Sequence, residues 1–365
     1  MNEKYDILHI SILAGDLSRT GGVRRSDQLK EAVREIGGKT ININSRTFSE
    51  HQSIFDWIYR GFFCGVVILL CLTHGLRFSV LRELVACWLE VRFKLADMRN
   101  PIVYLEINNG ISIALLILLK IFNIKYVCFP HNIEFLVPNN APACFRSAKK
   151  SMHAELSGYH GALKIFAISR FDAAILSCRG LHASVFSYFP SKADIDIYSD
   201  VRTSKYQEGD VHEYLILGTS NYTPTFISIR DMLEVIRVSD GDYRVSIVGF
   251  GTERFSCYAS DRIKILGAVS DNDLLDVVRR CTAMLINQKQ TTGMLTRIIE
   301  MNLCGLPQLV ISDYFQAEGL EQYGVRLVAL ADLDKKELPV VAKFFSKPLS
   351  DLLLINARDY TLVQG

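Results

Sequence analysis

The sequence has no arrangement of cysteines that would hold a metal or a disulfide framework. Its nine cysteines are scattered over 365 residues, with no CxxC pair and no Cys/His cluster. Structural zinc sites bring their ligands together at short, recurring spacings, and disulfide frameworks belong to short chains dense in cysteine. We therefore predict no bound metal, no cofactor and a cytoplasmic chain with reduced thiols.

An excess of charge of either sign is also missing. Lysine and arginine number 41, and aspartate and glutamate number 39, which leaves a formal net charge of +2. Proteins that bind nucleic acids through their overall field carry a strong basic excess. We expect no nucleic-acid partner, so an anionic ligand would be bound by local groups. With 49% hydrophobic and 22% charged residues, the chain has the composition of a globular protein and the length of two domains.

No apolar run is long enough to cross a bilayer. The longest, residues 61–72, has about a dozen residues, whereas a spanning helix needs roughly 20. The polar residues 1–6 lead directly into a strand-like run, unlike a secretory signal peptide. The stretch 58–95 mixes large apolar side chains with arginine and lysine, as interfacial helices do. Two interpretations remain open for it: buried helices of a first domain, or peripheral contact with a membrane.

What the sequence does contain is a regular alternation of short apolar runs and longer helical stretches, which is typical of βαβ units and a parallel sheet. In the first half, we expect strands at 7–13, 39–43, 102–106, 126–130 and 165–169, and helices at 27–36 and 112–121. In the second half, we expect strands at 214–217, 244–248, 263–266, 283–286 and 308–311. The polar stretch 191–212 between the two sets is the predicted linker.

The alternation predicts an α/β fold with two doubly wound, Rossmann-like domains that face each other across a cleft. The first would cover residues 1–195 and the second 205–345, with two further helices at 339–345 and 349–357.

Ligands of doubly wound folds lie beyond the carboxyl ends of the strands. After the first strand, Gly21 and Gly22 lead into a helix that also carries Arg24. Glycine allows close approach of the backbone, and a helix start offers free N–H groups to an anion, although an ordinary turn is an equal alternative. Neither GxGxxG nor GxxxxGK[ST] occurs, which disfavours a classical dinucleotide site and a P-loop.

A histidine directly follows the strand expected at 126–130. The imidazole of His131 could hydrogen-bond an acceptor hydroxyl or a transferred sugar. A single histidine at such a place is more often structural, but the neighbouring Asn132 and Glu134 favour a function.

Two strands of the second half end in glycine-containing turns. Their residues are Gly249, Gly251, Gly267 and Val269. Such turns expose main-chain N–H and C=O groups that could recognise the edge of a nucleobase, although each alone is an ordinary turn.

The densest signal is the run TTGMLTRIIE at 291–300. Its small residues predict a loop that opens a helix at Gly293 or Met294, with free N–H groups and the helix dipole directed at a diphosphate. Arg297 and Glu300 would share one face of that helix, where the arginine could bind phosphate and the glutamate could accept from ribose hydroxyls. The alternative is an exposed ion pair within the helix. The predicted donor-binding residues of the loop are Thr292, Gly293, Met294 and Leu295.

Together, these motifs resemble those of GT-B glycosyltransferases of the large family 4-like group, over most of the chain. The segment 21–24 (GGVR) is similar to that family's first-domain glycine loop, 131–134 (HNIE) to its HNxE segment, and 167–172 (AISRFD) to its V-S-x-x-D strand end. The segment 218–225 (GTSNYTPT) resembles the opening G-S-x-x-Y-x-P-N of its second domain, with Gly218 and Ser220 at matching positions. The run 291–300 resembles G-x-G-x-x-x-K-x-x-E.

The resemblance implies where a donor and an acceptor would bind. The second domain would hold a nucleoside-diphosphate sugar of UDP or GDP type, with Arg297 on the diphosphate and Glu300 on the ribose. The first domain would hold the acceptor near the 21–24 and 131–134 segments, and a helix within 346–365 would return to that domain.

The sequence also departs from the family pattern. Thr292 stands where many members carry a second glutamate that contacts the donor sugar, and an arginine and lysine of the second domain's first turn are absent. The remaining positive partners for a diphosphate are Arg297, Lys289 and Arg254. The Asp194-Ile195-Asp196 segment has the pattern of a metal-bridging pair, but it falls in the predicted linker and is interpreted as a solvated turn.

We therefore predict a metal-independent glycosyltransferase that acts on a saccharide or lipid-linked saccharide, in bacterial polysaccharide or lipopolysaccharide assembly at the inner face of the cytoplasmic membrane. His131, Arg297 and Glu300 are the predicted catalytic residues. Two alternatives remain: a sugar-nucleotide epimerase of the same fold, and an inactive sugar-binding or scaffolding protein.

Overall fold

The computed structural model describes residues 5–13, 21–44, 65–66, 68–69, 73–137, 144–204, 212–239, 241–287, 292–310 and 325–327. Lys289 and the predicted helices at 339–345, 349–357 and 346–365 lie outside the described residues. No helix among the described residues is both long enough and apolar enough to cross a membrane.

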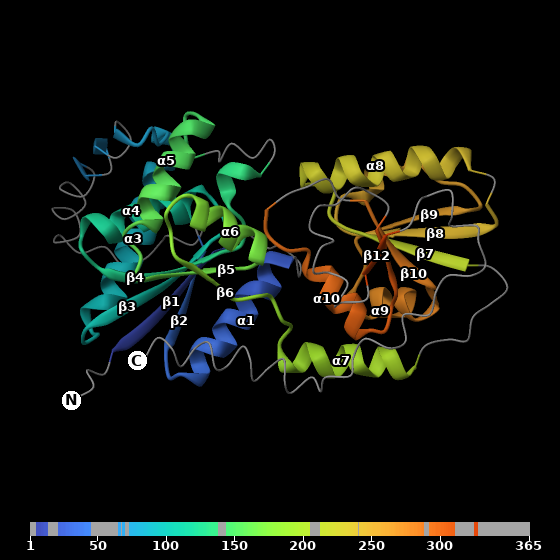
Figure 1. Cartoon of the computed structure of the whole chain (residues 1–365), viewed down its shortest axis with the longest axis horizontal. Coiled ribbons are helices and arrows are strands. Elements are labelled where there is room, and N and C mark those ends of the chain that lie inside the picture. Colours follow the sequence, from blue (N-terminus) through green and yellow to red (C-terminus); the bar gives the residue numbers. More distant parts are fainter. Residues whose placement is uncertain are drawn as a thin grey trace. The chain divides into compact units, whose positions relative to one another are not determined.

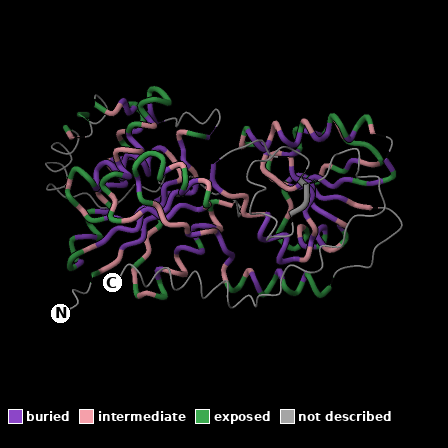
Figure 2. Tube along the Cα trace, viewed as in Figure 1, coloured by how far each residue is buried: buried purple, intermediate pink, exposed green. Residues whose placement is uncertain are grey.

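The chain divides into two compact units (Figure 1). Among the described residues, the first runs to Phe189 and also includes Thr292–Met294, and the second contains those from Pro190 to Asn287 and from Leu295 to Leu327. Figure 2 shows that buried residues concentrate on the strands and on the inner faces of the helices within each unit. Each unit therefore has its own core, as the predicted two-domain organisation requires.

The first unit is a parallel sheet covered by helices. Its strands are β1 (Asp6–Leu13), β2 (Lys39–Asn44), β3 (Pro101–Ile107), β4 (Lys125–Pro130), β5 (Lys164–Ala167) and β6 (Ala183–Val185). Its α-helices are α1 (Gly21–Glu35), α3 (Leu81–Ala96), α4 (Gly110–Ile121), α5 (Ala148–Tyr159) and α6 (Arg170–Cys178), and its short 3₁₀ helices are η1 (Phe78–Val80) and η2 (Glu134–Leu136). The sheet order is β2-β1-β3-β4-β5-β6, and all of its pairs are parallel.

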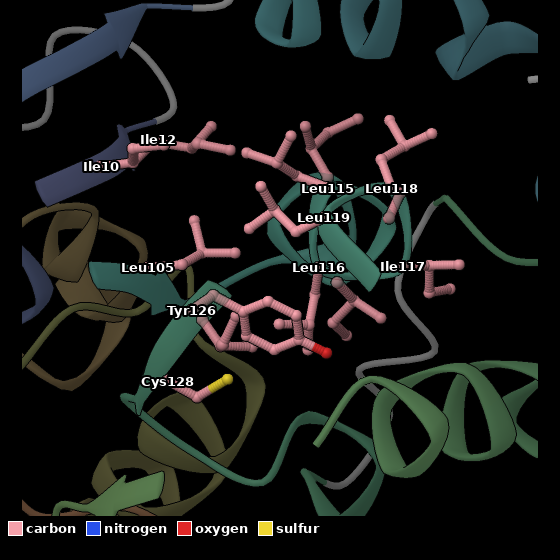
Figure 3. Packing of buried hydrophobic residues seen from close by; sticks show 14 of the residues in the cluster. Ile10, Ile12, Leu105, Leu115, Leu116, Ile117, Leu118, Leu119, Tyr126 and Cys128 are labelled. Atoms are coloured by element: carbon pink, nitrogen blue, oxygen red, sulfur yellow. The ribbon is translucent and has the colours of Figure 1, made fainter. Parts of the chain in front are cut away.

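Alternating side chains of this sheet enter two separate cores. On one face, Leu105 of β3 and Tyr126 of β4 pack with α3, α4 and α5 (Figure 3). On the other face, Tyr104 of β3 packs with α1. Successive residues of a strand point to opposite faces, so a continuous apolar run predicts a strand buried on both sides. Helix α4 is apolar all round and mostly buried, and its start is fixed by a capping box between Asn109 and Ser112.

The second unit repeats the plan. Its strands are β7 (His212–Leu217), β8 (Tyr243–Val248), β9 (Ile263–Gly267), β10 (Ala283–Ile286), β11 (Gln308–Val310) and β12 (Val325–Leu327). Its helices are α7 (Lys192–Thr203), α8 (Thr223–Val238), the 3₁₀ helix η3 (Thr252–Tyr258), α9 (Asp271–Arg280) and α10 (Thr296–Leu303). The parallel sheet has the order β12-β11-β10-β7-β8-β9. Strands β7 to β11 lie within about two residues of the predicted positions, whereas β12 was not predicted.

The predicted linker is wrong in its main part. Residues 192–203 form α7, and Ser191 caps that helix by accepting from the N–H of Asp194 at 3.3 Å. Ile195 is buried. The Asp194-Ile195-Asp196 segment therefore lies on a helix of the second unit and is not a solvated turn.

Part of the stretch 58–95 is a buried helix, as one interpretation predicted. Helix α3 buries Leu84, Trp88 and Val91 in the first unit. Its opposite side carries Phe93, of which 71% is exposed, and Phe78 of η1 is 52% exposed. The described part of this stretch thus has a buried face, and single phenylalanines are exposed outside it.

Candidate functional site

In each sheet the strand order reverses once, and polar residues lie near the point of reversal. In the first unit the strand order reverses between β1 and β3, and in the second between β7 and β10. Loops on either side of such a switch point diverge and leave a crevice at the carboxyl ends of the strands, where ligands of doubly wound folds bind.

A buried polar cluster lies at the switch point of the first unit. It consists of His9 and Ser11 on β1, Ser26 on α1, Glu106 on β3 and His131 directly after β4. On β1 and β3 these polar residues alternate with apolar ones, so they face α1 while their neighbours enter the larger core. The backbone N–H of His131 donates to the carbonyl of Ile107 at 2.9 Å, which continues the β4–β3 pairing by one residue.

Glu106 is the centre of this cluster. Its Oε2 lies 2.8 Å from Nε2 of His131 and accepts from the hydroxyl of Ser26, which is also 3.2 Å from the hydroxyl of Ser11. Its Oε1 lies 2.7 Å from Nε2 of His9, without the alignment of a hydrogen bond. Both carboxylate oxygens are therefore in contact with an imidazole.

The groups around the Glu106 carboxyl group favour its ionised form. Burial alone would raise its pKa, but the hydrogen bond from His131 and the adjacent His9 outweigh burial and hold the pKa well below the ordinary range. An uncompensated buried charge costs several kcal/mol, so the two imidazoles and the serine hydroxyl are what make this charge tolerable.

A second buried carboxyl group fixes the backbone that follows His131. Oε1 of Glu155 accepts from the N–H of Glu134, and its Oε2 accepts from the N–H of Phe135, both at 3.1 Å. Tyr159 also donates its hydroxyl to Glu155 at 2.8 Å. Burial, and then the proximity of the two acids, raises the pKa of Glu155, while burial raises the pKa of Glu134. Glu134 is buried, so this predicted acceptor-side residue lies beneath the surface.

The predicted donor loop is anchored in the first unit by two of its residues. The hydroxyl of Thr292 bonds both backbone groups of Ile133, at 3.1 Å from the N–H and 3.2 Å from the carbonyl. The N–H of Gly293 donates to the carboxylate of Asp172, at 3.0 Å from one oxygen and 3.3 Å from the other. Thr292 thus holds the loop against the residues after His131. The Gly293 N–H, predicted to meet a diphosphate, is bonded to a carboxylate in this structure.

Gly293 has no room for a side chain. Its φ is +86°, and an added Cβ would lie 2.0 Å from Oδ1 of Asn132 and 2.8 Å from the carbonyl oxygen of His131. Asn132 is half-buried beside this loop. The loop can lie this close to the residues after β4 only because position 293 is glycine.

Gly21, Gly22 and Arg24 form the first turn of α1 and not a loop before it. The neighbouring Arg25 is buried and bonds the carbonyls of Phe186 and Ser187, at 2.5 and 3.1 Å. That arginine therefore ties α1 to the chain after β6, whereas Arg24 is half-buried.

In the second unit, the turns after β7 and β8 lie against each other. An added Cβ at Gly249, whose φ is +139°, would lie 1.9 Å from the carbonyl oxygen of Gly218. Ser220 donates its hydroxyl to the carbonyl of Gly251 at 2.5 Å, and its N–H donates to the carbonyl of Phe250 at 3.0 Å. Both turns are therefore held in one defined conformation, with the side chain of Phe250 49% exposed.

The turn after β9 joins this group. The N–H of Gly249 donates to the carbonyl of Gly267 at 2.8 Å, and Ala268 donates its N–H to the carboxylate of Glu253 at 3.0 Å. Val269 is half-buried beyond it. The predicted base-binding turns are thus brought together at one edge of the sheet.

Arg297 lies at the switch point of the second unit. An added Cβ at Gly218 would be 3.2 Å from its Nη1, so the guanidinium approaches the backbone just after β7. Glu300 is buried, which rules out an exposed ion pair with Arg297. Helix α10 begins at Thr296, two to three residues after the predicted start, and Met294 and Leu295 precede it half-buried.

The cation–π contact of Arg254 is with a helix and not with the turns at the switch point. Arg254 is exposed on η3, and its guanidinium lies 5.0 Å from the ring centre of Phe226 on α8. Its described cation–π partner is therefore a helix of the same unit.

Known proteins match the chain in structure alone. No family model and no curated protein matches the sequence. Staphylococcus aureus MnaA with UDP matches over 99% of this chain and 98% of its own, at 11% identity and a TM-score of 0.55. The catalytic domain of starch synthase IV from Arabidopsis thaliana, bound to ADP and acarbose, matches over 99% of both chains, at 9% identity and a TM-score of 0.55.

A third match is Alr3699/HepE from Anabaena with UDP-glucose, over 89% of this chain and 86% of its own, at 14% identity and a TM-score of 0.55. Structures named as UDP-GlcNAc 2-epimerases also match, with TM-scores under 0.5. The chain has the GT-B fold. At these identities the likeness establishes the fold and not the reaction, and the family 4-like resemblance remains a prediction.

Sequence reasoning missed several polar residues of this GT-B chain. His9 and Glu106 lie inside strands, whereas ligands of doubly wound folds are expected beyond strand ends. The signal was a buried polar residue inside an apolar run, at His9 and Ser11 of β1 and at Glu106 of β3, which is unusual for a strand buried on both faces. Glu155 lies within a helix and has no comparable signal. Asp172 was part of a predicted motif, but its bond to Gly293 joins segments far apart in the sequence.

Proposed function

We propose that the chain is a glycosyltransferase that moves a sugar from a nucleoside-diphosphate sugar to a saccharide acceptor. The observation that carries this proposal is the site of the second unit, where Arg297 approaches the turn after β7, and the turns after β8 and β9 pack beside it in sequence. A cationic group beside glycine-containing turns suits a ligand with a diphosphate at one end and a flat base at the other.

The donor would lie against the second unit. The guanidinium of Arg297 would bind the diphosphate, and the turns at Gly249 and Gly267 would contact the base. Glu300 is a buried residue of α10, three positions after Arg297. Its carboxylate would accept hydrogen bonds from the ribose hydroxyls. The neighbours MnaA, HepE and starch synthase IV were solved with UDP, UDP-glucose and ADP, which supports a nucleotide ligand for this fold.

In the reaction, the acceptor oxygen bonds to the anomeric carbon, the bond from that carbon to the diphosphate breaks, and the hydroxyl proton is released. Arg297 would stabilise the charge that develops on the leaving diphosphate. His131, held by Glu106, would orient a hydroxyl of the sugar or the acceptor. This proposal needs no metal.

An epimerase of the same fold would bind the same donor and need no acceptor. The discriminating experiment incubates UDP-, GDP- and ADP-sugars with the protein, with and without a mixture of oligosaccharide acceptors, and analyses the products. Transfer predicts a glycosylated acceptor and release of the nucleoside diphosphate, at the same rate with Mg²⁺ or a chelator.

His131→Ala should lower turnover far more than donor affinity.

In the product analysis, an epimerised nucleotide sugar formed without acceptor would replace the proposed glycosyltransferase by the epimerase. Binding of a nucleotide sugar without any product would favour the inactive binding protein.

We further propose a lipid-linked acceptor at a membrane surface. The support is the exposed Phe78 and Phe93, which lie next to Arg77 and Lys94 in the sequence. Flotation with anionic vesicles tests this: Phe93→Ser should weaken binding, whereas Val238→Ser, a similarly exposed position of the second unit at 72%, should not. Failure of the whole protein to float would point to a soluble acceptor.

A further inference from the structure

The buried cluster around Glu106 determines more than the position of His131. The ionised carboxylate has no proton to give, so it can only accept hydrogen bonds. Nε2 of His131 lies 2.8 Å from Oε2 of Glu106, and that nitrogen must therefore carry the proton of their hydrogen bond.

The carboxylate is fixed on both sides, so it cannot turn away from the histidine. Its Oε1 is held next to Nε2 of His9 at 2.7 Å, and its Oε2 also accepts from Ser26. Glu106 and His9 are fully buried, so bulk solvent does not compete for the carboxylate. A charge-assisted hydrogen bond in such surroundings is worth more than one between neutral groups.

The other ring nitrogen of His131 has a different environment. Among the described residues, the bond to Glu106 is the ring's only hydrogen bond. His131 retains 7% of its surface, while the rest of the cluster on β1 and β3 has none. In a neutral imidazole with the proton on Nε2, the nitrogen Nδ1 carries a lone pair and accepts hydrogen bonds.

We propose that Glu106 is a positioning residue that holds His131 in the Nε2–H tautomer, so that Nδ1 is presented as a hydrogen-bond acceptor for a hydroxyl group. His131 would then receive a hydrogen bond from a sugar or acceptor hydroxyl and would not donate one to a phosphate or carbonyl oxygen. Only the identity of this hydroxyl rests on the proposed function.

The test observes the ring nitrogens of His131 directly. The intact protein is labelled with ¹⁵N in its histidine rings, and long-range ¹H–¹⁵N spectra are recorded in mildly alkaline buffer. The chain has eight histidines, and the signals that vanish in His131→Gln identify this ring. We expect a protonated Nε2 and an unprotonated Nδ1 in the wild-type protein. A proton on Nδ1, alone or together with one on Nε2, would overturn the proposal without any need for a variant of Glu106.

Two variants separate positioning from general packing. In Glu106→Gln the amide can accept from Nε2–H or donate to a bare Nε2, so the preference for one tautomer should fall by about tenfold or more. Ser26→Ala removes a different donor to the same carboxylate and should keep the wild-type tautomer. An unchanged tautomer ratio in Glu106→Gln would show that Glu106 does not set it.

Kinetics then connect the tautomer with the reaction. If the protein transfers sugar, Glu106→Gln should lower kcat with little change in the KM for the donor. The double variant Glu106→Gln/His131→Gln should have the same kcat as His131→Gln alone. A further loss would mean that Glu106 acts other than through His131. If no sugar is transferred but the Nε2–H tautomer is found, the proposed function fails and the assignment of the tautomer stands.

Discussion

At the residue scale, the functional features of this chain depend on close approaches that only one residue type permits. Gly293 has a left-handed backbone conformation and lies against Asn132 and the carbonyl of His131. Gly37 has a similar φ of +78°, but an added Cβ there would meet nothing within 4 Å. The two positions separate the cost of the backbone conformation from the cost of the missing space.

We expect Gly37→Ala to lower the free energy of unfolding by about 1–2 kcal/mol, because alanine resists the left-handed region. Gly293→Ala should cost about 1–3 kcal/mol more, since the methyl group must displace the residues after β4. Urea unfolding of both variants measures this difference. Equal losses would mean that the loop is not packed against those residues.

Asp172 gives the protein a pH dependence of stability. Burial raises its pKa to about 6, against an ordinary value of 3.8, although hydrogen bonds from Ser169 and the N–H of Gly293 partly offset this. Between these two values the folded chain binds a proton at Asp172 that the unfolded chain has released. Its contribution to the free energy of unfolding therefore falls as the pH rises through this window, and it stays low at higher pH.

Asp172→Asn should remove this contribution, which amounts to roughly 1–3 kcal/mol. The measurement is the free energy of unfolding as a function of pH for the wild-type protein and the variant, and their difference isolates Asp172 from other buried acids. The exposed carboxylate Asp27, which pairs with Lys30 on α1, provides the control Asp27→Asn. Asp27→Asn should keep the wild-type dependence of the unfolding free energy on pH. If Asp172→Asn also kept it, Asp172 would not be its source.

At the scale of elements, the central parallel strands could be predicted because strands such as β3, β4 and β10 are apolar runs buried on both faces. Strand β3 and helix α4 were found within one or two residues by this rule. The rule failed for α7, whose sequence is polar overall. Its buried residues Ile195, Tyr198 and Val201 recur every three positions, which is the spacing of one helix face and was the available signal.

The start of α10 shows why loop geometry was harder to predict. Small residues at 291–293 indicate a helix start, but Thr292 and Gly293 are bonded to Ile133 and Asp172, so the helix begins only at Thr296. Tertiary contacts decided this boundary, and no local pattern contains them.

The candidate site was predictable only in part for the same reason. Glycine turns and Arg297 follow strands and carry recognisable motifs, so sequence reasoning found them. The cluster of His9, Glu106 and His131 joins three strands that are neighbours in the sheet but distant in the chain. Only the order of the strands brings these residues together.

At the scale of the whole molecule, the two units carry different chemistry on the same plan. The first has a buried carboxylate that fixes a histidine, and the second has an arginine beside glycine turns. Both arrangements lie where the strand order reverses. Under the proposed function, the second unit would hold the donor and the first unit the group that receives the sugar.

The proposed function depends above all on the binding of a nucleoside diphosphate to the second unit through Arg297. Calorimetric titration with UDP, GDP and ADP tests it most directly, in the wild-type protein, in Arg297→Ala and in the control Arg230→Ala. Arg230 is an exposed arginine of the same unit that pairs with Asp231. One nucleotide should bind the wild-type protein and the control equally, and bind Arg297→Ala about tenfold or more weakly. Binding of none of the three, or equal affinity in Arg297→Ala, would contradict the account.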